Sequence, residues 1–218
     1  MARKTTIENI TSILWDYNGT LLNDTHACVD SMNQLLEKRK IPKLKLDHYR
    51  NIFTFPVKQY YEKAGFDFSV ENFETPAIEF IKLYNRELPS IRLFDEVINI
   101  LEFFRIRKIN QYIISAMKQE DLKESVEHQG ITAFFNEIRG IDDHYADGKI
   151  HTAKALVESH GLKPKNICLI GDTLHDDEVG RSLGCEVILV ASGHQSSKRL
   201  KKSGRPVINS LSELQKIF

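Results

Sequence analysis

The sequence predicts an α/β protein with a doubly wound parallel sheet and a helical segment inserted into it. Two patterns support this fold class. After about residue 91, short apolar runs with the character of buried strands alternate with helical segments, which is typical of a parallel sheet covered on both faces. From Pro42 to Ser90 the pattern is helical and contains no strand. With 218 residues, the chain is long enough for one sizeable core and such an insertion.

The first strand is expected at Ile10–Trp15, a short apolar run. A helix follows, which Asn23 or Asp24 can cap and which Pro42 ends, because proline cannot continue a helix. The segment after Pro42 is rich in aromatic residues and is interrupted by proline and glycine, which indicates a helical insertion with turns.

Beyond the insertion, strands and helices alternate to the end of the chain. The expected strands are Gln111–Ser115, Glu137–Arg139, Asn166–Ile170, Glu186–Val190 and Val207–Ile208. The expected helices are Asp95–Arg105, Gln119–His128, His151–His160, Asp176–Leu183 and one that starts at Leu211. The polar segment 193–199 is interpreted as a surface loop, and its His194 is given no role.

The composition argues against several classes of function. The 30 basic and 30 acidic residues cancel, so no overall field favours a nucleic acid or a membrane surface, and a small-molecule partner fits better. The first ten residues lack the apolar run of a secretory signal, and no segment has the pattern of a membrane span. The 3 cysteines are widely spaced, which is typical of a reduced protein, and we expect a cytoplasmic location.

Asp16 is the most informative residue of the sequence. It follows the predicted first strand and precedes Gly19 and Thr20, so it lies at the carboxyl end of a strand, where open parallel sheets bind ligands. Gly19 allows a turn that presents backbone N–H groups to an anion. Asp16 is therefore the candidate nucleophile.

Two further polar sites follow predicted strands. Ser115 ends one strand, before Ala116, and taken alone a serine here more often caps the next helix. Asp172 follows another strand and opens an acidic cluster that contains Asp176 and Asp177. Such a cluster needs a counter-charge, and Mg²⁺, which prefers carboxylates, water and phosphate oxygens, provides it. A solvated acidic helix start is the alternative interpretation.

A bound anion would also need a cation to offset its charge. Lys149 lies just before the predicted helix His151–His160, and Lys154 lies one turn into it. Placement favours Lys149, while a solvated lysine without a role is the alternative for either residue.

Taken together, these segments resemble the four motifs of the haloacid dehalogenase superfamily, in the same order along the chain. The turn that begins at Asp16 is similar to the first motif, whose aspartate attacks phosphorus to form an aspartyl-phosphate. Ser115 resembles the second-motif residue that binds a phosphoryl oxygen, and Lys149 resembles the third-motif lysine. Asp172 and Asp176 resemble the acidic pair of the fourth motif.

The resemblance implies a Rossmann-like core of residues 1–22 and 91–218 with a small helical cap of residues 23–90. It implies Mg²⁺ held by Asp16, the main-chain carbonyl of Asn18 and Asp172, with Asp176 or Asp177 in support, of which Asp176 is favoured. The residues expected to contact the substrate are Gly19, Thr20, Ser115, Ala116 and, from the cap, Lys58. The layout is closest to phosphoglycolate phosphatase-like members, which implies a small phosphorylated metabolite as the substrate.

Asn18 departs from the family pattern, in which a second aspartate protonates the leaving group and later activates water. An amide has no proton to exchange near neutral pH, and losing general acid–base help typically costs about 10² to 10⁴ in rate. Three explanations stay open: a substrate with a good leaving group, a proton from another residue or water, or loss of catalysis with binding retained.

The sequence thus predicts a Mg²⁺-dependent phosphomonoester hydrolase in which Asp16, Asn18 and Lys149 are the catalytic positions. A module that binds a phosphorylated metabolite without hydrolysing it is the second hypothesis. A metal-independent dehalogenase is the third, and it is disfavoured because its chemistry has no use for the acidic cluster at Asp172.

Overall fold

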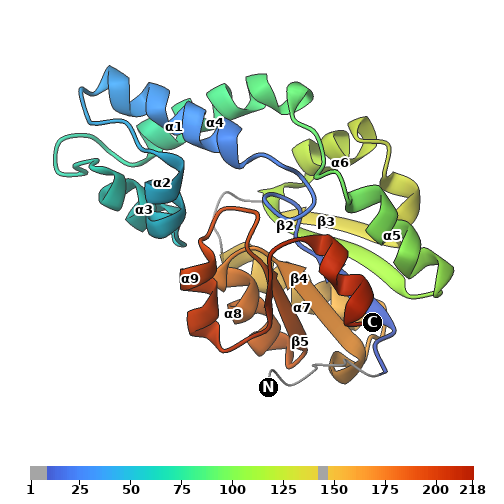
Figure 1. Cartoon of the computed structure of the whole chain (residues 1–218). Helices are drawn as coiled ribbons and strands as arrows, with labels where there is room; N and C mark the ends of the chain where they lie inside the picture. Colours follow the sequence, from blue (N-terminus) through green and yellow to red (C-terminus); the bar gives the residue numbers. More distant parts are fainter. Residues whose placement is uncertain (1–8, 142–146) are drawn as a thin grey trace.

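A six-stranded parallel sheet forms the centre of the protein, in the strand order β3-β2-β1-β4-β5-β6. The structure is a computed structural model that describes residues 9–141 and 147–218 (Figure 1). The strands are β1 (Ser12–Trp15), β2 (Asn110–Lys118), β3 (Glu137–Ile141), β4 (Ile167–Gly171), β5 (Glu186–Val190) and β6 (Val207–Ile208). This is the doubly wound α/β fold that the alternation of strands and helices predicts.

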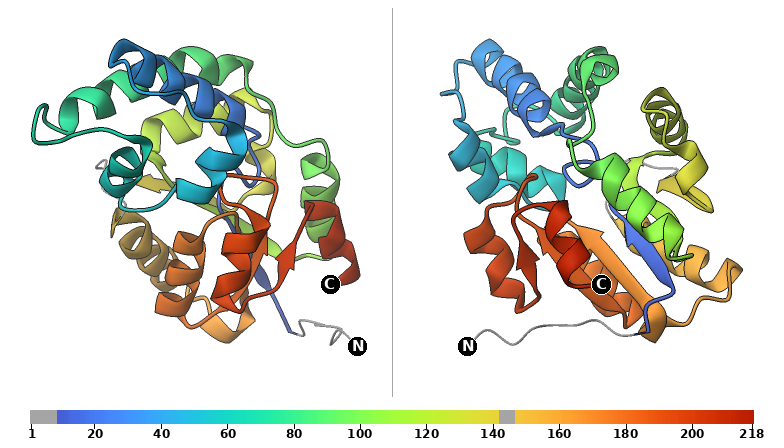
Figure 2. Two further views of the ribbon diagram at one scale, coloured as in Figure 1. Left: turned by 60° about the vertical axis from the view of Figure 1, so that its left-hand side comes forward. Right: turned by 45° about the vertical axis from the view of Figure 1, so that its right-hand side comes forward.

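Helices cover both faces of the sheet (Figure 2). The elements around the sheet are α5 (Val97–Ile106), α6 (Gln119–His128), α7 (Asp147–Ser159), α8 (Leu174–Leu183), α9 (Ser197–Leu200) and the 3-10 segment η5 (Leu211–Lys216). A regular helix was expected in place of η5; the segment is short and begins at a capping box on Ser210.

The strands divide their side chains between two apolar cores, because successive residues of a strand point to opposite faces. Ile13 and Trp15 of β1 belong to the core that α5, α6 and η5 cover, and the Trp15 ring lies 5.8 Å from that of Phe104 in α5. Leu14 belongs to the opposite core, which contains Leu156 of α7 and residues of α8. All of these residues are buried, so the centre of the sheet is a rigid base for the loops at its edge.

Four helices pack on one another away from the sheet, at one end of the molecule (Figures 1 and 2). They are α1 (Thr25–Lys38), α2 (Leu46–Ile52), α3 (Val57–Ala64) and α4 (Glu74–Glu87). Aromatic rings hold them together: the Tyr61 ring lies 5.0 Å from Phe66 and 5.4 Å from Phe73. We propose this helical group, residues 23–90, as the cap.

Strand β2 and helix α7 both extend further than the sequence predicts. Strand β2 continues past Ser115 to Lys118, and its register with β3 shifts between Ile114 and Lys118. Helix α7 begins at Asp147, so Lys149 lies in its first turn and not before it. Lys149 in this turn contacts Asp16 and Asp176, and tertiary contacts of this kind override local helix propensity.

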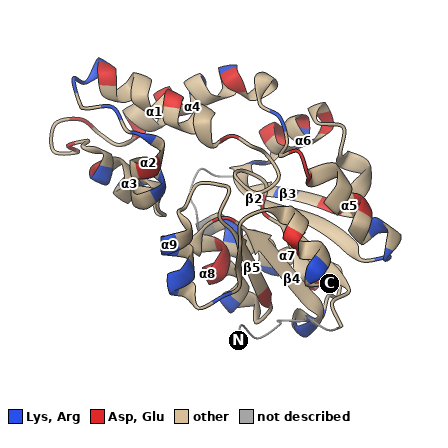
Figure 3. Cartoon of the chain, in the orientation of Figure 1, with Lys and Arg blue, Asp and Glu red and all other residues tan. Residues whose placement is uncertain are grey.

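Charged side chains of both signs are interspersed over the helices, with a basic group on and after α9 (Figure 3). Formal charges sum to +0 over the whole sequence. Within the two described ranges, the helices are too short or too polar to cross a lipid bilayer.

Candidate active site

The candidate site lies where the chain order in the sheet reverses. Strands β1 and β4 are neighbours, and from them the order runs to β3 on one side and to β6 on the other. Asp16 directly follows β1 and Asp172 directly follows β4, and the Asp16 amide donates to the carbonyl of Ile170 at 2.8 Å. Loops at the carboxyl ends of strands diverge at such a point and leave a crevice for a ligand.

Three carboxylates converge at this point. Oxygen atoms of Asp16, Asp172 and Asp176 all lie within 4.8 Å of one another, and all three residues are buried. The Thr20 hydroxyl bridges two of them, at 3.1 Å from Asp16 Oδ2 and 3.4 Å from Asp172 Oδ1. Asp177 points elsewhere, because its carboxylate accepts one hydrogen bond from Arg181 and one from Arg205. Of the two aspartates considered for the metal, the structure brings Asp176 to the cluster.

Lys149 enters the same cluster from the first turn of α7. Its ammonium group forms ion pairs with Asp16 and with Asp176 Oδ1, the latter at 2.6 Å, and the residue is buried. Lys154 is exposed. Burial alone would lower the pKa of Lys149, but the charges of the two carboxylates raise it above its usual value, so the lysine stays cationic.

The carboxyl group of Asp16, the nucleophile candidate, ionises less readily in this site than it would in water. Burial raises the pKa of Asp16 to about 6, although Lys149 opposes the shift. Burial also raises the pKa of Asp172 well above its usual value, and the charges of Asp16 and Asp176 add to this effect. The free site therefore holds carboxyl groups that a divalent cation would help to ionise.

Asp176 differs from its two neighbours because its hydrogen-bond donors keep its pKa below the usual value, whereas theirs are raised. Oδ1 accepts from Lys149, and Oδ2 accepts from the Thr173 amide at 3.0 Å and the Thr173 hydroxyl at 2.7 Å. Burial opposes its ionisation, but Lys149 and Thr173 hold the pKa of Asp176 below its usual value. Asp176 is thus an anion that orients Lys149 and caps α8.

Gly19 is required by the close approach of two neighbours. Its φ of 73° lies in the left-handed region, and a Cβ atom here would lie 2.4 Å from Asp172 Oδ2 and 2.4 Å from Cδ2 of His194. The turn after Asp16 is therefore pressed against the acidic residue that follows β4.

Ser115 lies beside Asn18 and does not cap the following helix. Its hydroxyl is buried, donates to Asn18 Oδ1 at 3.3 Å and accepts from the Met117 amide at 3.1 Å. Lys118 occupies the cap position of α6. Ala116 follows Ser115 in β2 and is half-buried.

Two residues of the site carried no functional expectation from the sequence. His194 is buried, its amide donates to Asp172, and its ring bonds Tyr49 of α2 at 2.8 Å. The expectation of a surface loop at this residue is wrong, because the aromatic residues of the cap cover it. The carboxylate of Asp24, considered only as a helix cap, instead accepts from the Gly19 amide at 2.8 Å. The one sequence signal for His194 was its position shortly after a buried strand, which it shares with Asp172.

The cap residue that the sequence singled out does not reach the carboxylates. Lys58 is exposed, and its ammonium lies 5.6 Å from the centroid of the Phe68 ring, within the cap. Phe53 and Phe55 meet the core instead, with ring centroids 5.1 Å from His194 and 4.8 Å from His175.

Fold and site together define a class of protein: a Rossmann-like α/β protein with an acidic centre at the switch point of its sheet and a helical insertion beside it. The profile of the family described as haloacid dehalogenase-like hydrolase matches residues 13–190. The chain belongs to this family.

Solved structures from several bacteria share the fold at low sequence identity. A haloacid dehalogenase-like family hydrolase from Streptococcus pneumoniae superposes with a TM-score of 0.82 at 18% identity, covering 95% of this chain and 97% of that one. A predicted phosphoglycolate phosphatase from Haemophilus somnus has a TM-score of 0.75 at 18% identity, with 97% and 99% covered. A family hydrolase from Deinococcus radiodurans with bound phosphate and sodium has a TM-score of 0.72 at 16% identity, with 94% and 93% covered. No curated protein sequence matches the chain.

Proposed function

We propose that the protein is a Mg²⁺-dependent phosphatase that hydrolyses a small phosphorylated metabolite through an aspartyl-phosphate on Asp16. One observation carries the proposal: Lys149 is buried between Asp16 and Asp176, with Asp172 beside them. A structural ion pair needs one carboxylate, whereas this lysine contacts two, and a third lies beside them at the carboxyl ends of the strands. The similar structure from Haemophilus somnus is described as a predicted phosphoglycolate phosphatase, which agrees with this class of substrate.

The donor set fits magnesium in chemistry and in charge. Asp16 and Asp172 offer carboxylate oxygens, and the Asn18 main-chain carbonyl would complete the set, all of them hard ligands that suit Mg²⁺. Asp176 would support the ion from beside Lys149. When bound, Mg²⁺ would shield the phosphoryl charge from these carboxylates.

The reaction we propose has two displacements at phosphorus. A carboxylate oxygen of Asp16 attacks, the bond from phosphorus to the leaving oxygen breaks, and water then cleaves the aspartyl-phosphate to release phosphate and restore Asp16. Lys149 and Ser115 would hold the phosphoryl oxygens, and the backbone amides near Gly19 and Thr20 would add further donors. Ala116 would contribute its main chain beside Ser115.

A phosphate-release screen tests this function. We expect release that requires Mg²⁺ and stops with a chelator, over a panel of sugar phosphates, nucleotides, phosphoglycolate, acetyl phosphate and p-nitrophenyl phosphate. Because Asn18 has no proton to give, kcat/KM is expected to be at least about 10²-fold higher for the aryl and acyl phosphates than for the alkyl phosphates. Binding of beryllofluoride with no turnover of any compound would instead indicate a binding module.

Magnesium binding is expected to weaken as the pH falls through 6. Burial raises the pKa of Asp16 to about 6 in the metal-free site, so its carboxyl is largely protonated at pH 5 and largely ionised at pH 7. The ion needs the carboxylate, hence the apparent affinity for Mg²⁺ should fall at least about tenfold from pH 7 to pH 5, with proton uptake when the metal leaves. Titration calorimetry in two buffers of different ionisation enthalpy measures both quantities. Equal affinity at the two pH values would contradict the assignment of Asp16 as a ligand.

We also propose a reducing compartment, the cytoplasm, as the place of action. Cys28, Cys168 and Cys185 are all buried free thiols. Burial raises the pKa of the Cys168 thiol well above its usual value, which keeps it inert.

A further inference from the structure

Asp24 is the most heavily bonded carboxylate of the described residues near the site. It is buried at the start of the cap and accepts from the Gly19 amide at 2.8 Å, from Asn18 Nδ2 at 2.9 Å, from the Tyr84 hydroxyl at 2.8 Å and from His194 Nε2 at 3.1 Å. A carboxylate has about four lone-pair sites, so these donors satisfy it. The bonds tie the turn after β1, helix α4 of the cap and the loop after β5 to one side chain.

The surroundings of Asp24 favour a charged carboxylate. The Gly19 amide and the side chains of Asn18, Tyr84 and His194 all direct a hydrogen atom toward its two oxygen atoms. Every one of these neighbours presents a donor. A second carboxylate in place of any of these neighbours would face Asp24 without a hydrogen-bond donor.

This arrangement accounts for the amide at position 18. Asn18 Nδ2 donates to Asp24 and also to the Tyr84 hydroxyl, at 2.8 Å, while Asn18 Oδ1 accepts from Ser115. An aspartate at 18 would place one of its oxygens where Nδ2 now lies, 2.9 Å from Asp24 Oδ2. Like charges at that separation in a buried site repel strongly, and the donor is lost as well.

We propose that Asp24 is a positioning residue of the active site and that it determines the chemistry allowed at position 18: an amide beside the Asp24 carboxylate, or a carboxylate beside an amide at 24. The proposal rests on the proposed function for its kinetic consequence, but its structural part stands on the hydrogen bonds alone. Asp24 acts through the turn that carries Asn18 and Gly19.

A double-mutant cycle tests the exchange, with Asn18→Asp, Asp24→Asn and the double variant compared with the wild type. In the wild-type background, Asn18→Asp is expected to lower the thermal midpoint by about 5 to 10 °C. In the Asp24→Asn background the same change is expected to shift the midpoint by no more than about 2 °C, because the amide at 24 donates to the new carboxylate.

The effect of Asn18→Asp on kcat should have opposite signs in the wild-type and Asp24→Asn backgrounds. Asn18→Asp alone is expected to lower kcat for phosphoglycolate about tenfold. In the Asp24→Asn background it is expected to raise that kcat about tenfold, and to raise kcat for p-nitrophenyl phosphate much less, because a carboxylate at 18 can protonate an alkoxide. A purely structural role for Asp24 would not alter the ratio of alkyl to aryl turnover.

Equal costs of Asn18→Asp in the two backgrounds, in midpoint or in turnover, would overturn the proposal. The thermal arm needs no substrate, so it decides the matter even if the protein releases no phosphate and the proposed function fails. An intact thermal coupling with no turnover would then support the positioning role and reject only the phosphatase.

A second pair of variants covers the case in which Asp24→Asn does not fold. Tyr84→Phe removes one donor to Asp24, and Tyr60→Phe is its matched control, because the buried Tyr60 hydroxyl has no hydrogen-bond partner among the described residues. We expect kcat/KM for p-nitrophenyl phosphate to fall about three- to tenfold in Tyr84→Phe and to stay unchanged in Tyr60→Phe. The same small effect in both variants would overturn the proposal.

Discussion

Asp16→Asn is expected to abolish Mg²⁺-dependent phosphate release, with kcat lowered by a factor on the order of 10⁴ or more. The amide has nearly the volume of the carboxylate but is a poor nucleophile, and it replaces a proposed anionic ligand of Mg²⁺ with a neutral one. Lys149 keeps Asp176 as a partner, so the ion pair that orders α7 remains. The measurement is phosphate release from p-nitrophenyl phosphate with and without Mg²⁺.

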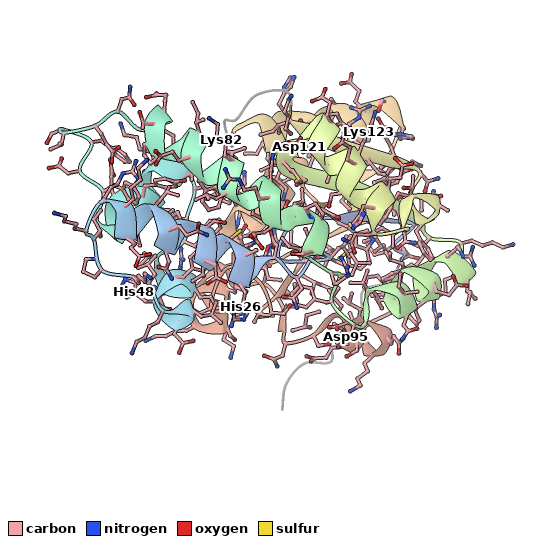
Figure 4. All side chains as sticks on the ribbon, turned by 90° about the horizontal axis from the view of Figure 1, so that it is seen from above. His26, His48, Lys82, Asp95, Asp121 and Lys123 are labelled. Atoms are coloured by element: carbon pink, nitrogen blue, oxygen red, sulfur yellow. The ribbon has the colours of Figure 1, made fainter. Side chains whose placement is uncertain are left out.

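We expect the Asp16→Asn variant to fold like the wild type, so that its loss of activity can be assigned to chemistry and not to unfolding. Burial already raises the pKa of Asp16 to about 6, so the native metal-free site disfavours the charge that the amide lacks. The thermal midpoint without Mg²⁺ should therefore equal or exceed that of the wild type. Asp95→Asn is the matched control, because Asp95 is exposed two residues before α5 (Figure 4), and it should retain full activity. Phosphate transferred from substrate to any residue other than Asp16 in a quenched reaction would refute the mechanism.

The fold was predictable because its signals are local. Apolar runs such as Ile167–Gly171 are buried on both faces, and a run of this kind predicts a strand of a parallel sheet. Helices with one apolar face alternate with these strands. Element ends were less predictable, since β2 runs past Ser115 and α7 starts four residues before His151. Those ends depend on tertiary contacts that propensity does not record.

Much of the candidate site was predictable for a similar reason. Asp16 and Asp172 each follow an apolar strand, Ser115 follows the apolar run Tyr112–Ile114 within β2, and parallel strands present their carboxyl ends at one edge of the sheet. The contact of Lys149 with Asp16 could be predicted only from the order of the family motifs, because no local pattern around α7 indicates which lysine faces the site.

Asp24 and His194 were not predictable as partners, because 170 residues separate them in the sequence (194 − 24). Their contact depends on how the cap packs on the core. A sequence shows the type of a side chain, whereas its partner is set by the packing of α2 and α4 over the turn after β1. The same packing explains why Lys58, which looks suitable in sequence, points at Phe68. The contacts of cap residues are thus the part of this site that sequence patterns predict least well.

Lys149→Met is expected to reduce kcat by a factor on the order of 10³ and to lower the free energy of unfolding at pH 8 by about 3 to 5 kcal/mol. The variant loses the cation that would hold the phosphoryl group, and it leaves Asp16 and Asp176 as buried neighbours without their shared partner. Methionine keeps most of the apolar stem, so packing is largely retained. Lys82→Met is the control, because Lys82 is exposed on α4 (Figure 4) and should change neither quantity.

The stability loss of Lys149→Met should depend on pH, and the pKa values of Asp16 and Asp176 determine whether it grows or shrinks as the pH rises. Without Lys149, Asp176 no longer has the partner that holds its pKa down, and the pKa of Asp16 rises beyond about 6. Carboxyls with a raised pKa bind more protons in the folded state than in the unfolded one, so stability falls as the pH rises through their folded pKa values. The deficit relative to the wild type should be small at pH 5 and large at pH 8, and Mg²⁺ should recover part of it by replacing the lost charge. A deficit in urea denaturation that is equal at both pH values would mean that Lys149 stabilises the fold by packing alone.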